Sequence, residues 1–222
     1  MKLSVVVPSY NHWALTHQCL FDLYKHCVDS LDEVVLANDC STDKEYYDGL
    51  SFWKDQKLLP LRELRNKENV GFTTSANRGM KSSTGDIIVL LSNDVRVLSN
   101  MCKQVRDIIT LDDKVLIGNT LVDFDSGWNT FNGKTYKYLD GSLLAATRSV
   151  WEELGWFDEI YAPGDFEDVD ISTKAVSLGY TLMSMNDSLI NHLAAQTTGY
   201  TPERLERTKR NQKKFEQKWV IK

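Results

Sequence analysis

The chain has 222 residues, of which 42% are hydrophobic and 26% charged, an ordinary composition for a globular protein that buries one large core. Its formal net charge of -5 argues against nucleic acid as the main partner. No apolar run approaches the roughly 20 residues that a membrane-spanning helix needs, so the sequence predicts no transmembrane segment.

The N-terminus and the cysteines bear on the compartment. A strand pattern begins at Leu3, which leaves no room for a signal peptide. The cysteines lack the paired spacing of metal ligands, and we expect free thiols at Cys19, Cys27, Cys40 and Cys102. These features predict a cytoplasmic protein.

The first half of the chain alternates apolar strand patterns with helical patterns. Strands are predicted at residues 3–7, 33–37, 61–64 and 86–91, and helices at 15–27, 46–53, 73–81 and 97–110. Pro8 is expected to end the first strand because it has no N–H group to donate. Such alternation predicts right-handed crossovers and an α/β fold with a mostly parallel sheet.

After residue 113 the alternation becomes less regular. We predict strands at 115–117, 143–147, 180–185 and 190–192, hairpin or irregular structure at 121–139, and helices at 150–154, 166–178 and 202–218. Asp165 is expected to cap the helix that follows it. The predicted organisation is one domain over 1–200, in two parts (1–112 and 113–200), followed by a basic amphipathic helix over 201–222.

A polar turn follows the buried strand at 86–91. Ser92, Asn93 and Asp94 come directly after this apolar run. In open α/β sheets, ligands bind at the carboxyl edge of the strands. A carboxylate at that edge can hold a divalent cation, which in turn can hold a diphosphate. The alternative is a plain polar turn after a core strand.

Five loop motifs follow one another at suitable distances. They are Pro8-Ser-Tyr-Asn11, Asn38-Asp-Cys-Ser-Thr-Asp43, Asn69-Val-Gly-Phe72 with Asn77-Arg-Gly79, Ser92-Asn-Asp-Val95 and Phe166-Glu-Asp-Val-Asp170. In this order they resemble glycosyltransferase family 2, a family of inverting enzymes with the GT-A fold, over about residues 3 to 195. Members similar to rhamnosyltransferases and other hexosyltransferases share the finer pattern.

The resemblance implies a catalytic domain over 1–200, with a nucleotide-sugar half (1–112) and an acceptor half (113–200). The base of the nucleotide would lie against Asp39 and the first loop, through Pro8, Tyr10 and Asn11. A carboxylate at Asp39 can accept the imide N–H of uracil or thymine, which cytosine lacks, so we expect a UDP- or dTDP-sugar. Alternatively, Asp39 only organises an Asx-type turn with Ser41.

The same resemblance implies further donor contacts. The ribose, sugar and diphosphate would lie against Asn69, Gly71, Asn77, Asn93 and Asp94. Gly71 permits close approach of a backbone. Alternatively, these positions are loop and helix-cap residues.

The family's usual Asp-X-Asp metal motif is incomplete here, because Ser92 stands at the first acidic position. The resemblance implies that Asp94 and His192 hold a divalent metal, Mn²⁺ or Mg²⁺, which neutralises charge on the leaving nucleoside diphosphate. An imidazole ligand favours Mn²⁺. The alternative for His192 is a structural residue beside a core strand.

The resemblance also implies a catalytic pair, Glu167 and Asp168, with Asp168 as the general base. On the predicted helix Asp168 lies on the same face as three apolar residues, Ile171, Ala175 and Leu178. We therefore expect this face to point inward. Glu167 belongs to a polar face that we expect to be solvated, with Asp170 and Lys174. Alternatively, Asp168 is an acid placed at the helix start by the helix dipole.

The acceptor side has fewer signals. Trp156 is the preferred acceptor contact, because aromatic faces suit sugar rings, although they suit hydrophobic cores equally well. Residues 121–137 are a candidate acceptor-side segment. The basic helix at 202–218 either docks on the domain or makes peripheral contact with anionic lipid or a lipid-linked acceptor.

Two functions are consistent with these features. The first is a metal-assisted, inverting glycosyltransferase that moves a sugar from a UDP- or dTDP-sugar to a hydroxyl of a glycan or glycolipid, as in polysaccharide biosynthesis. The second is a catalytically inactive nucleotide-sugar or glycan-binding module, which Ser92 favours. A dinucleotide dehydrogenase would need a Gly-x-Gly-x-x-Gly turn after the first strand, and the sequence has none.

Overall fold

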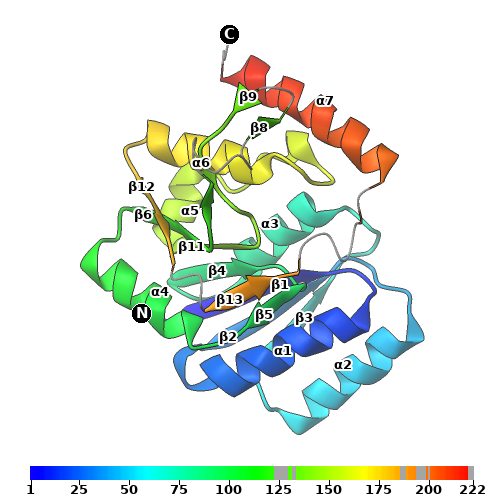
Figure 1. Ribbon diagram of the computed structural model, residues 1–222. Coiled ribbons are helices and arrows are strands. Elements are labelled where there is room, and N and C mark those ends of the chain that lie inside the picture. The colour runs from blue at the N-terminus through cyan, green and yellow to red at the C-terminus, as the bar shows by residue number, and fades with distance from the viewer. Residues whose placement is uncertain (123–129, 132–133, 186–188, 194–198, 200, 220–222) are drawn as a thin grey trace.

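The computed structural model describes residues 1–122, 130–131, 134–185, 189–193, 199 and 201–219. A seven-stranded sheet forms its centre, in the order β12-β6-β11-β4-β1-β2-β3 (Figure 1). The strands are β1 (Leu3–Ser9), β2 (Glu33–Asn38), β3 (Leu61–Arg65), β4 (Ile87–Leu91), β6 (Val115–Gly118), β11 (Leu143–Thr147) and β12 (Thr181–Ser184). Only β11 runs antiparallel to its neighbours in this sheet, which confirms the predicted α/β fold with a mostly parallel sheet.

Helices cover both faces of the sheet. One face carries α1 (Trp13–Cys27), α2 (Lys44–Gln56) and α4 (Met101–Leu111), and the other carries α3 (Phe72–Ser82), α5 (Arg148–Leu154) and α6 (Glu167–Ser177). Side chains of a strand alternate between the faces, so Val5 and Val7 pack in the first core and Val6 in the second. Short 3₁₀ turns occur at η1 (Val28–Ser30) and η2 (Glu159–Tyr161).

The first strand does not end at Pro8, as the sequence had suggested. β1 continues to Ser9, and Pro8 lies opposite Ala37 of β2. Pairing with β4 stops at Val6, so the following residues of β1 have a neighbouring strand on one side only. A missing N–H group is tolerated where one side of a strand is unpaired.

The predicted helix at 97–110 also begins later than expected. Residues Val95–Val97 form strand β5, and α4 starts at Met101 after Asn100, whose side chain accepts a hydrogen bond from the Lys103 N–H. β5 pairs antiparallel with β13 (Ile190–His192), in a register that sets His192 opposite Val95. This small ribbon brings His192 to the end of β4.

The predicted hairpin region contains two short antiparallel pairs. β7 (Leu121–Val122) pairs with β10 (Tyr138–Leu139), and β8 (Thr130–Phe131) pairs with β9 (Lys134–Thr135). The proposed acceptor-side segment at 121–137 lies partly outside the described residues, since 123–129 and 132–133 are not among them.

The start of α6 differs from the prediction in two respects. Asp165 does not cap the helix, because the N-cap residue is Phe166 and its side chain makes no capping hydrogen bond. The face expected to be solvated is buried, with Glu167 7% and Asp170 2% exposed, while Leu178 is exposed. Asp170 is buried against the C-terminal end of the helix at 202–218, where Lys218 and Trp219 both donate to its carboxylate.

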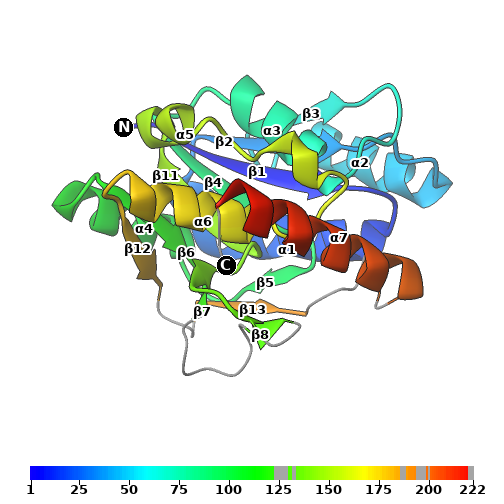
Figure 2. The ribbon, with the colours of Figure 1, turned by 90° about the horizontal axis from the view of Figure 1, so that it is seen from above.

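The last helix, α7 (Pro202–Lys218), is docked on the domain over the α6 side (Figures 1 and 2). Phe215 is 1% exposed and packs in a small core with Tyr136, Tyr161 and Phe166. Asn211 is also buried, and its Nδ2 group donates to three backbone carbonyls, those of Tyr161, Gly164 and Asp165, each at 2.9 Å. The helix therefore holds the loop that leads into α6. Within the described residues, no helix is long and apolar enough to cross a membrane.

Candidate active site

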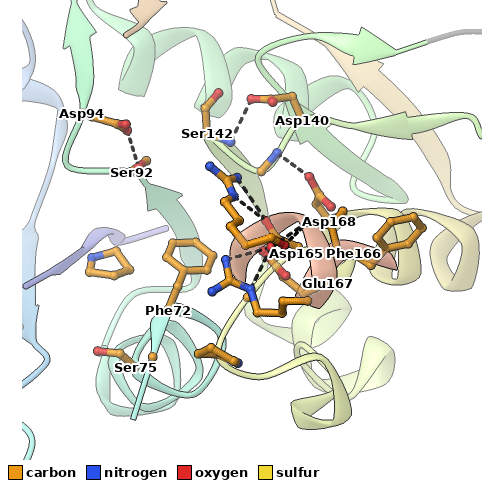
Figure 3. Close-up of a pocket in the computed structure, with 18 of the residues that line it drawn as sticks. Phe72, Ser75, Ser92, Asp94, Asp140, Ser142, Asp165, Phe166, Glu167 and Asp168 are labelled. Atoms are coloured by element: carbon orange, nitrogen blue, oxygen red, sulfur yellow. Dashed lines mark hydrogen bonds and ion pairs between the residues drawn. The ribbon is translucent and has the colours of Figure 1, made fainter. Parts of the chain in front are cut away.

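A cavity of about 700 Å³ opens where the carboxyl ends of β1 to β4 meet the start of α6 and the side of α7 (Figure 3). Its wall includes ten of the residues predicted from the sequence: Pro8, Tyr10, Asp39, Asn69, Gly71, Asn93, Asp94, Glu167, Asp168 and His192. The structure therefore brings motifs from both halves of the chain around one space.

Asp39 follows β2 on the wall of this cavity and is 4% exposed. Its Oδ1 accepts hydrogen bonds from Asn66 Nδ2 at 2.8 Å and the Val70 N–H at 2.9 Å, and its Oδ2 accepts from the Gly71 N–H at 2.8 Å. Asp39 thus fixes the loop after β3 and keeps acceptor capacity on Oδ2. The Asx-type turn expected at this position is made by Asn38, whose Oδ1 accepts from the Ser41 N–H.

Gly71 is required by a close contact between the two halves of the domain. Its φ is +84° and its ψ 169°, a conformation that is almost restricted to glycine. A Cβ atom built there would lie 2.3 Å from Pro163 Cβ. The space that Gly71 leaves is therefore filled by the loop before α6.

Two predicted donor contacts lie off the cavity wall. Asn11 uses its Oδ1 to accept from the Thr42 N–H at 2.7 Å, which ties the first loop to the second. Asn77 is 2% exposed and exchanges hydrogen bonds with the backbone of Phe157, donating to its carbonyl at 2.9 Å and accepting from its N–H at 3.0 Å. Both side chains position loops around the cavity.

Asp94 and His192 meet at the end of β4. His192 Nε2 lies 3.2 Å from Asp94 Oδ1, and His192 Nδ1 lies 3.7 Å from Asp140 Oδ1. The Ser92 hydroxyl donates to Asp94 Oδ1 at 2.6 Å, so the residue in the first acidic position orients the remaining carboxylate (Figure 3). Asn93 is 5% exposed and donates to Thr16 Oγ1.

The charge state of His192 follows from these neighbours. Burial opposes protonation, but the hydrogen bond to Asp94 and the charges of Asp140 and Asp94 outweigh it and raise the pKa of His192. Among the described residues, no group of three or more His, Cys, Asp or Glu side chains is arranged to hold a metal ion. A cation here would take two protein ligands at most from Asp94 and His192, with the rest from ligand and water oxygens.

Asp168 lies on the opposite side of the cavity, in the first turn of α6. Its Oδ1 accepts from the Val169 N–H at 2.8 Å and its Oδ2 from the Gly141 N–H at 3.2 Å. Burial and the nearby charge of Asp140 raise its pKa to about 7. A carboxylate with that pKa can both take up and release a proton near neutral pH.

Glu167 adjoins Asp168 and is 7% exposed. Within the described residues, its Oε2 has no hydrogen-bond partner. Burial, together with the charge of Asp168, raises the pKa of Glu167 well above its usual value. An unsatisfied buried carboxyl oxygen is costly, and such atoms in a cavity wall are suited to a ligand's hydroxyl groups.

Trp156, the expected acceptor contact, does not line the cavity. Its ring stacks on Trp151 with centroids 6.3 Å apart and planes 6° apart, and the Lys81 ammonium lies 6.0 Å from its centre. It packs against the core of the α3, α5 and α6 face.

Several residues of the cavity wall had no site role predicted from the sequence: Tyr136, Tyr138, Asp140, Asp165, Arg204 and Arg207. Asp140 follows β10 in an Asp-Gly turn, a signal that the sequence shows but that many plain turns share. The arginines stand three residues apart on α7, which is also the spacing of any solvated basic face. Neither signal is specific to a site.

Known proteins resemble this chain in sequence. A model of the family described as Glycosyl transferase family 2 matches residues 4–173. An uncharacterized glycosyltransferase of Haemophilus influenzae is 31% identical over 107 residues, which cover 48% of this chain and 34% of that protein. The chain thus spans about a third of the length of this curated relative.

Two solved structures share the fold. A mannosyltransferase from Pyrobaculum calidifontis, PcManGT, in complex with GDP-Man and Mn²⁺, has a TM-score of 0.75 at 21% identity, covering 100% of this chain and 64% of its own. GalNAc-T7 with UDP, GalNAc and Mn²⁺ has a TM-score of 0.77 at 16% identity, covering 97% of this chain and 48% of its own. Because the family model matches more than half of the residues, the chain belongs to glycosyltransferase family 2.

Proposed function

We propose that this chain transfers a sugar from a nucleoside diphosphate sugar to an acceptor hydroxyl with inversion at the anomeric carbon. One observation carries this proposal. A single cavity has Asp168, a carboxyl group whose pKa is raised to about 7, on one side and the Asp94–His192 pair on the other. The first suits a base and the second suits a diphosphate with its cation.

In the proposed reaction, the acceptor oxygen attacks the anomeric carbon while its proton passes to Asp168. The bond between the anomeric carbon and the phosphate oxygen breaks, and its electron pair leaves with the nucleoside diphosphate. One displacement inverts the configuration, through an oxocarbenium-like transition state. Glu167, beside the base, would hold hydroxyl groups of the sugar or acceptor.

The proposal includes a divalent cation, Mn²⁺ or Mg²⁺, held by Asp94 and His192. The carboxylate oxygen and the imidazole nitrogen lie 3.2 Å apart, a donor set that fits such an ion when the diphosphate completes its coordination. When bound, the ion would offset negative charge on the leaving group. Both structural relatives named above were crystallised with Mn²⁺.

For the donor base we propose uracil or thymine. The support is Asp39, whose Oδ2 accepts one backbone hydrogen bond and retains capacity for an imide N–H. One structural relative binds GDP-Man and the other UDP, so guanine is the competing base. The acceptor is proposed to be a glycan or glycolipid hydroxyl, with this part of the protein in the cytoplasm or in peripheral contact with a membrane.

The test is calorimetric titration of UDP, dTDP, GDP and CDP, each with Mn²⁺ and with a chelator, followed by a screen of sugar nucleotides for consumption. Metal-dependent binding of UDP or dTDP, with turnover of a matching sugar nucleotide, is the expected result. Binding of GDP alone would overturn the role of Asp39. Binding without turnover of any donor, over a broad acceptor panel, would favour the inactive binding module that Ser92 suggests.

A further inference from the structure

Helix α7 brings two positive charges to the wall of the cavity. Arg204 and Arg207 both line it, and their side chains are 28% and 20% exposed. Both contact the same carboxylate, that of Asp165, which lies in the loop before α6 (Figure 3). Three charged side chains therefore form one cluster, which we call the arginine clamp: Asp165, Arg204 and Arg207.

The carboxylate of the arginine clamp is saturated with donors. Asp165 Oδ1 accepts from Arg204 Nε at 3.1 Å and Nη2 at 3.0 Å, and Oδ2 accepts from Arg207 Nε at 2.8 Å and Thr208 Oγ1 at 3.1 Å. One negative charge thus faces two positive charges, so the clamp carries a net charge of about +1. Asp165 orients the guanidinium groups without neutralising both.

The two arginines of the clamp lie near different groups of the proposed site. Arg204 lies near enough to His192 to act against its protonation, although Asp94 and Asp140 raise the pKa of His192 overall. Arg207 likewise acts to lower the pKa of Glu167, although burial and the charge of Asp168 raise that pKa overall. Within the described residues, Nη1 of Arg207 has no hydrogen bond.

The turn after β4 offers few protein ligands to a cation that would bind the diphosphate. Asp94 is the single carboxylate of the turn after β4, because Ser92 occupies the other acidic position. A cation bound through Asp94 and His192 alone would be held by fewer protein ligands than a full carboxylate pair provides. The charge that develops on the leaving group therefore needs a second source of compensation.

We propose that Arg204 and Arg207 bind the diphosphate of the donor and stabilise its charge as it leaves. This inference rests on the proposed function. Guanidinium groups present paired N–H donors that match phosphate oxygens, and a clamp set in advance by Asp165 loses little freedom on binding. As the bond to the anomeric carbon breaks, the electron pair moves onto the β-phosphate oxygen, and the arginines stabilise it there.

The experiment compares Arg207→Gln with Arg210→Gln, a matched change on an exposed position of the same helix. The probe is whichever of UDP, dTDP and GDP the unaltered protein binds, titrated beside its nucleoside monophosphate, with Mn²⁺ and with chelator. Arg207→Gln should weaken binding of the diphosphate about tenfold or more and of the monophosphate less than about threefold, and the loss should be larger in chelator. Arg210→Gln should change neither.

Folding is checked by thermal unfolding of each variant, and Arg207→Lys, which keeps the charge, should retain most of the affinity. Equal diphosphate affinity in Arg207→Gln and the unaltered protein would overturn the inference, and so would an equal loss for both nucleotides. Unchanged diphosphate affinity with a raised acceptor KM would place the clamp on an anionic acceptor instead. If the unaltered protein binds no nucleoside diphosphate, the proposed function itself fails, whatever the variants do.

Discussion

Asp168 combines two properties that a general base needs, a position on the cavity wall and a raised pKa. Its backbone partners, the N–H groups of Gly141 and Val169, stabilise the ionised form, while burial and Asp140 oppose it. The balance of these effects leaves the carboxyl group able to change protonation near neutral pH. Asp140 therefore helps to raise the pKa of the proposed base, Asp168.

The replacement Asp168→Asn removes the proposed proton acceptor and keeps the shape of the side chain. General bases contribute about 100-fold to 10,000-fold, so we expect kcat to fall by at least about 100-fold while donor binding changes little. The measurement is release of nucleoside diphosphate beside calorimetric donor binding. Asp107→Asn, on the exposed outer side of α4, is the control, and ordinary turnover by Asp168→Asn would exclude Asp168 as the base.

The raised pKa of Asp168 also predicts a pH dependence. The base must be ionised to act, so kcat/KM should be constant above a pH of about 7 and fall about tenfold per pH unit below it. A profile measured between pH 5.5 and 8.5 tests this. A rate that stays flat down to pH 5.5 would show that the base titrates near the usual aspartate value and that burial does not tune it.

At the scale of elements, the site depends on contacts between loops that are distant in sequence. The loop after β3 is fixed on one side by Asp39 and on the other by Pro163, which occupies the space beside Gly71. α7 then holds the Pro163 loop through Asn211 and the arginine clamp. The loop after β3 is therefore held by the Pro163 loop, which is held in turn by α7.

Gly71→Ala tests the contact between the loops, and Gly179→Ala is a matched control. Both positions have a φ of +84°, but a Cβ at Gly71 would meet Pro163 whereas a Cβ at Gly179 has nothing within 4 Å. Gly179→Ala should cost about 1 kcal/mol of unfolding free energy, from backbone strain alone. Gly71→Ala should cost roughly 1–3 kcal/mol more and lower donor affinity.

Urea unfolding of both variants measures the difference. Equal stability losses at the two positions would mean that the loops adapt to the added methyl group. In that case Gly71 would matter for its backbone conformation only.

Strands and helices with clear apolar patterns could be predicted from the sequence, and the short strand β5 could not. β4 and α6 have continuous patterns, and the sequence located both to within one or two residues. β13 lies where a strand was predicted, at 190–192. β5 was not predicted, because three residues are too few for a period to be distinguished, and it is stabilised by pairing with β13 in a two-stranded ribbon. His192 was assigned by resemblance, but its placement beside Asp94 depends on that ribbon.

The same limit applies to the site. Residues in loops at strand ends, such as Asp39 and Asp94, could be predicted because parallel strands end at one edge. Arg204 and Arg207 could not, because only the tertiary docking of α7 turns a basic helix face toward the cavity. The burial of Asp170 was missed for the same reason, since its partners Lys218 and Trp219 are distant in sequence.

At the scale of the whole molecule, the cavity joins the two halves of the chain, so a bound donor should stabilise both. At 100 times its Kd, a nucleoside diphosphate adds about 2.7 kcal/mol to the unfolding free energy. For a chain of this size that corresponds to a rise in Tm of roughly 5–10 °C. Hydrogen exchange should slow at 66–72 and at 161–170 and 202–212 together.

Differential scanning fluorimetry and hydrogen-exchange mass spectrometry measure the two effects. Adenosine diphosphate at the same concentration controls for nonspecific binding of a nucleotide. Protection confined to the first 97 residues would contradict a ligand that contacts α6 and α7.

The dependence of the site on α7 also has a consequence for biosynthesis. A ribosome makes β1 to β4 first, and their edge carries Asp39 and Asp94. Arg204, Arg207 and Asn211 are added much later, and until they leave the exit tunnel nothing on α7 can fasten the loop that precedes Asp168. A nascent chain would therefore acquire the cavity wall that contains Asp39 and Asp94 before the wall that contains Asp168, and the complete cavity would form only after α7 has been translated.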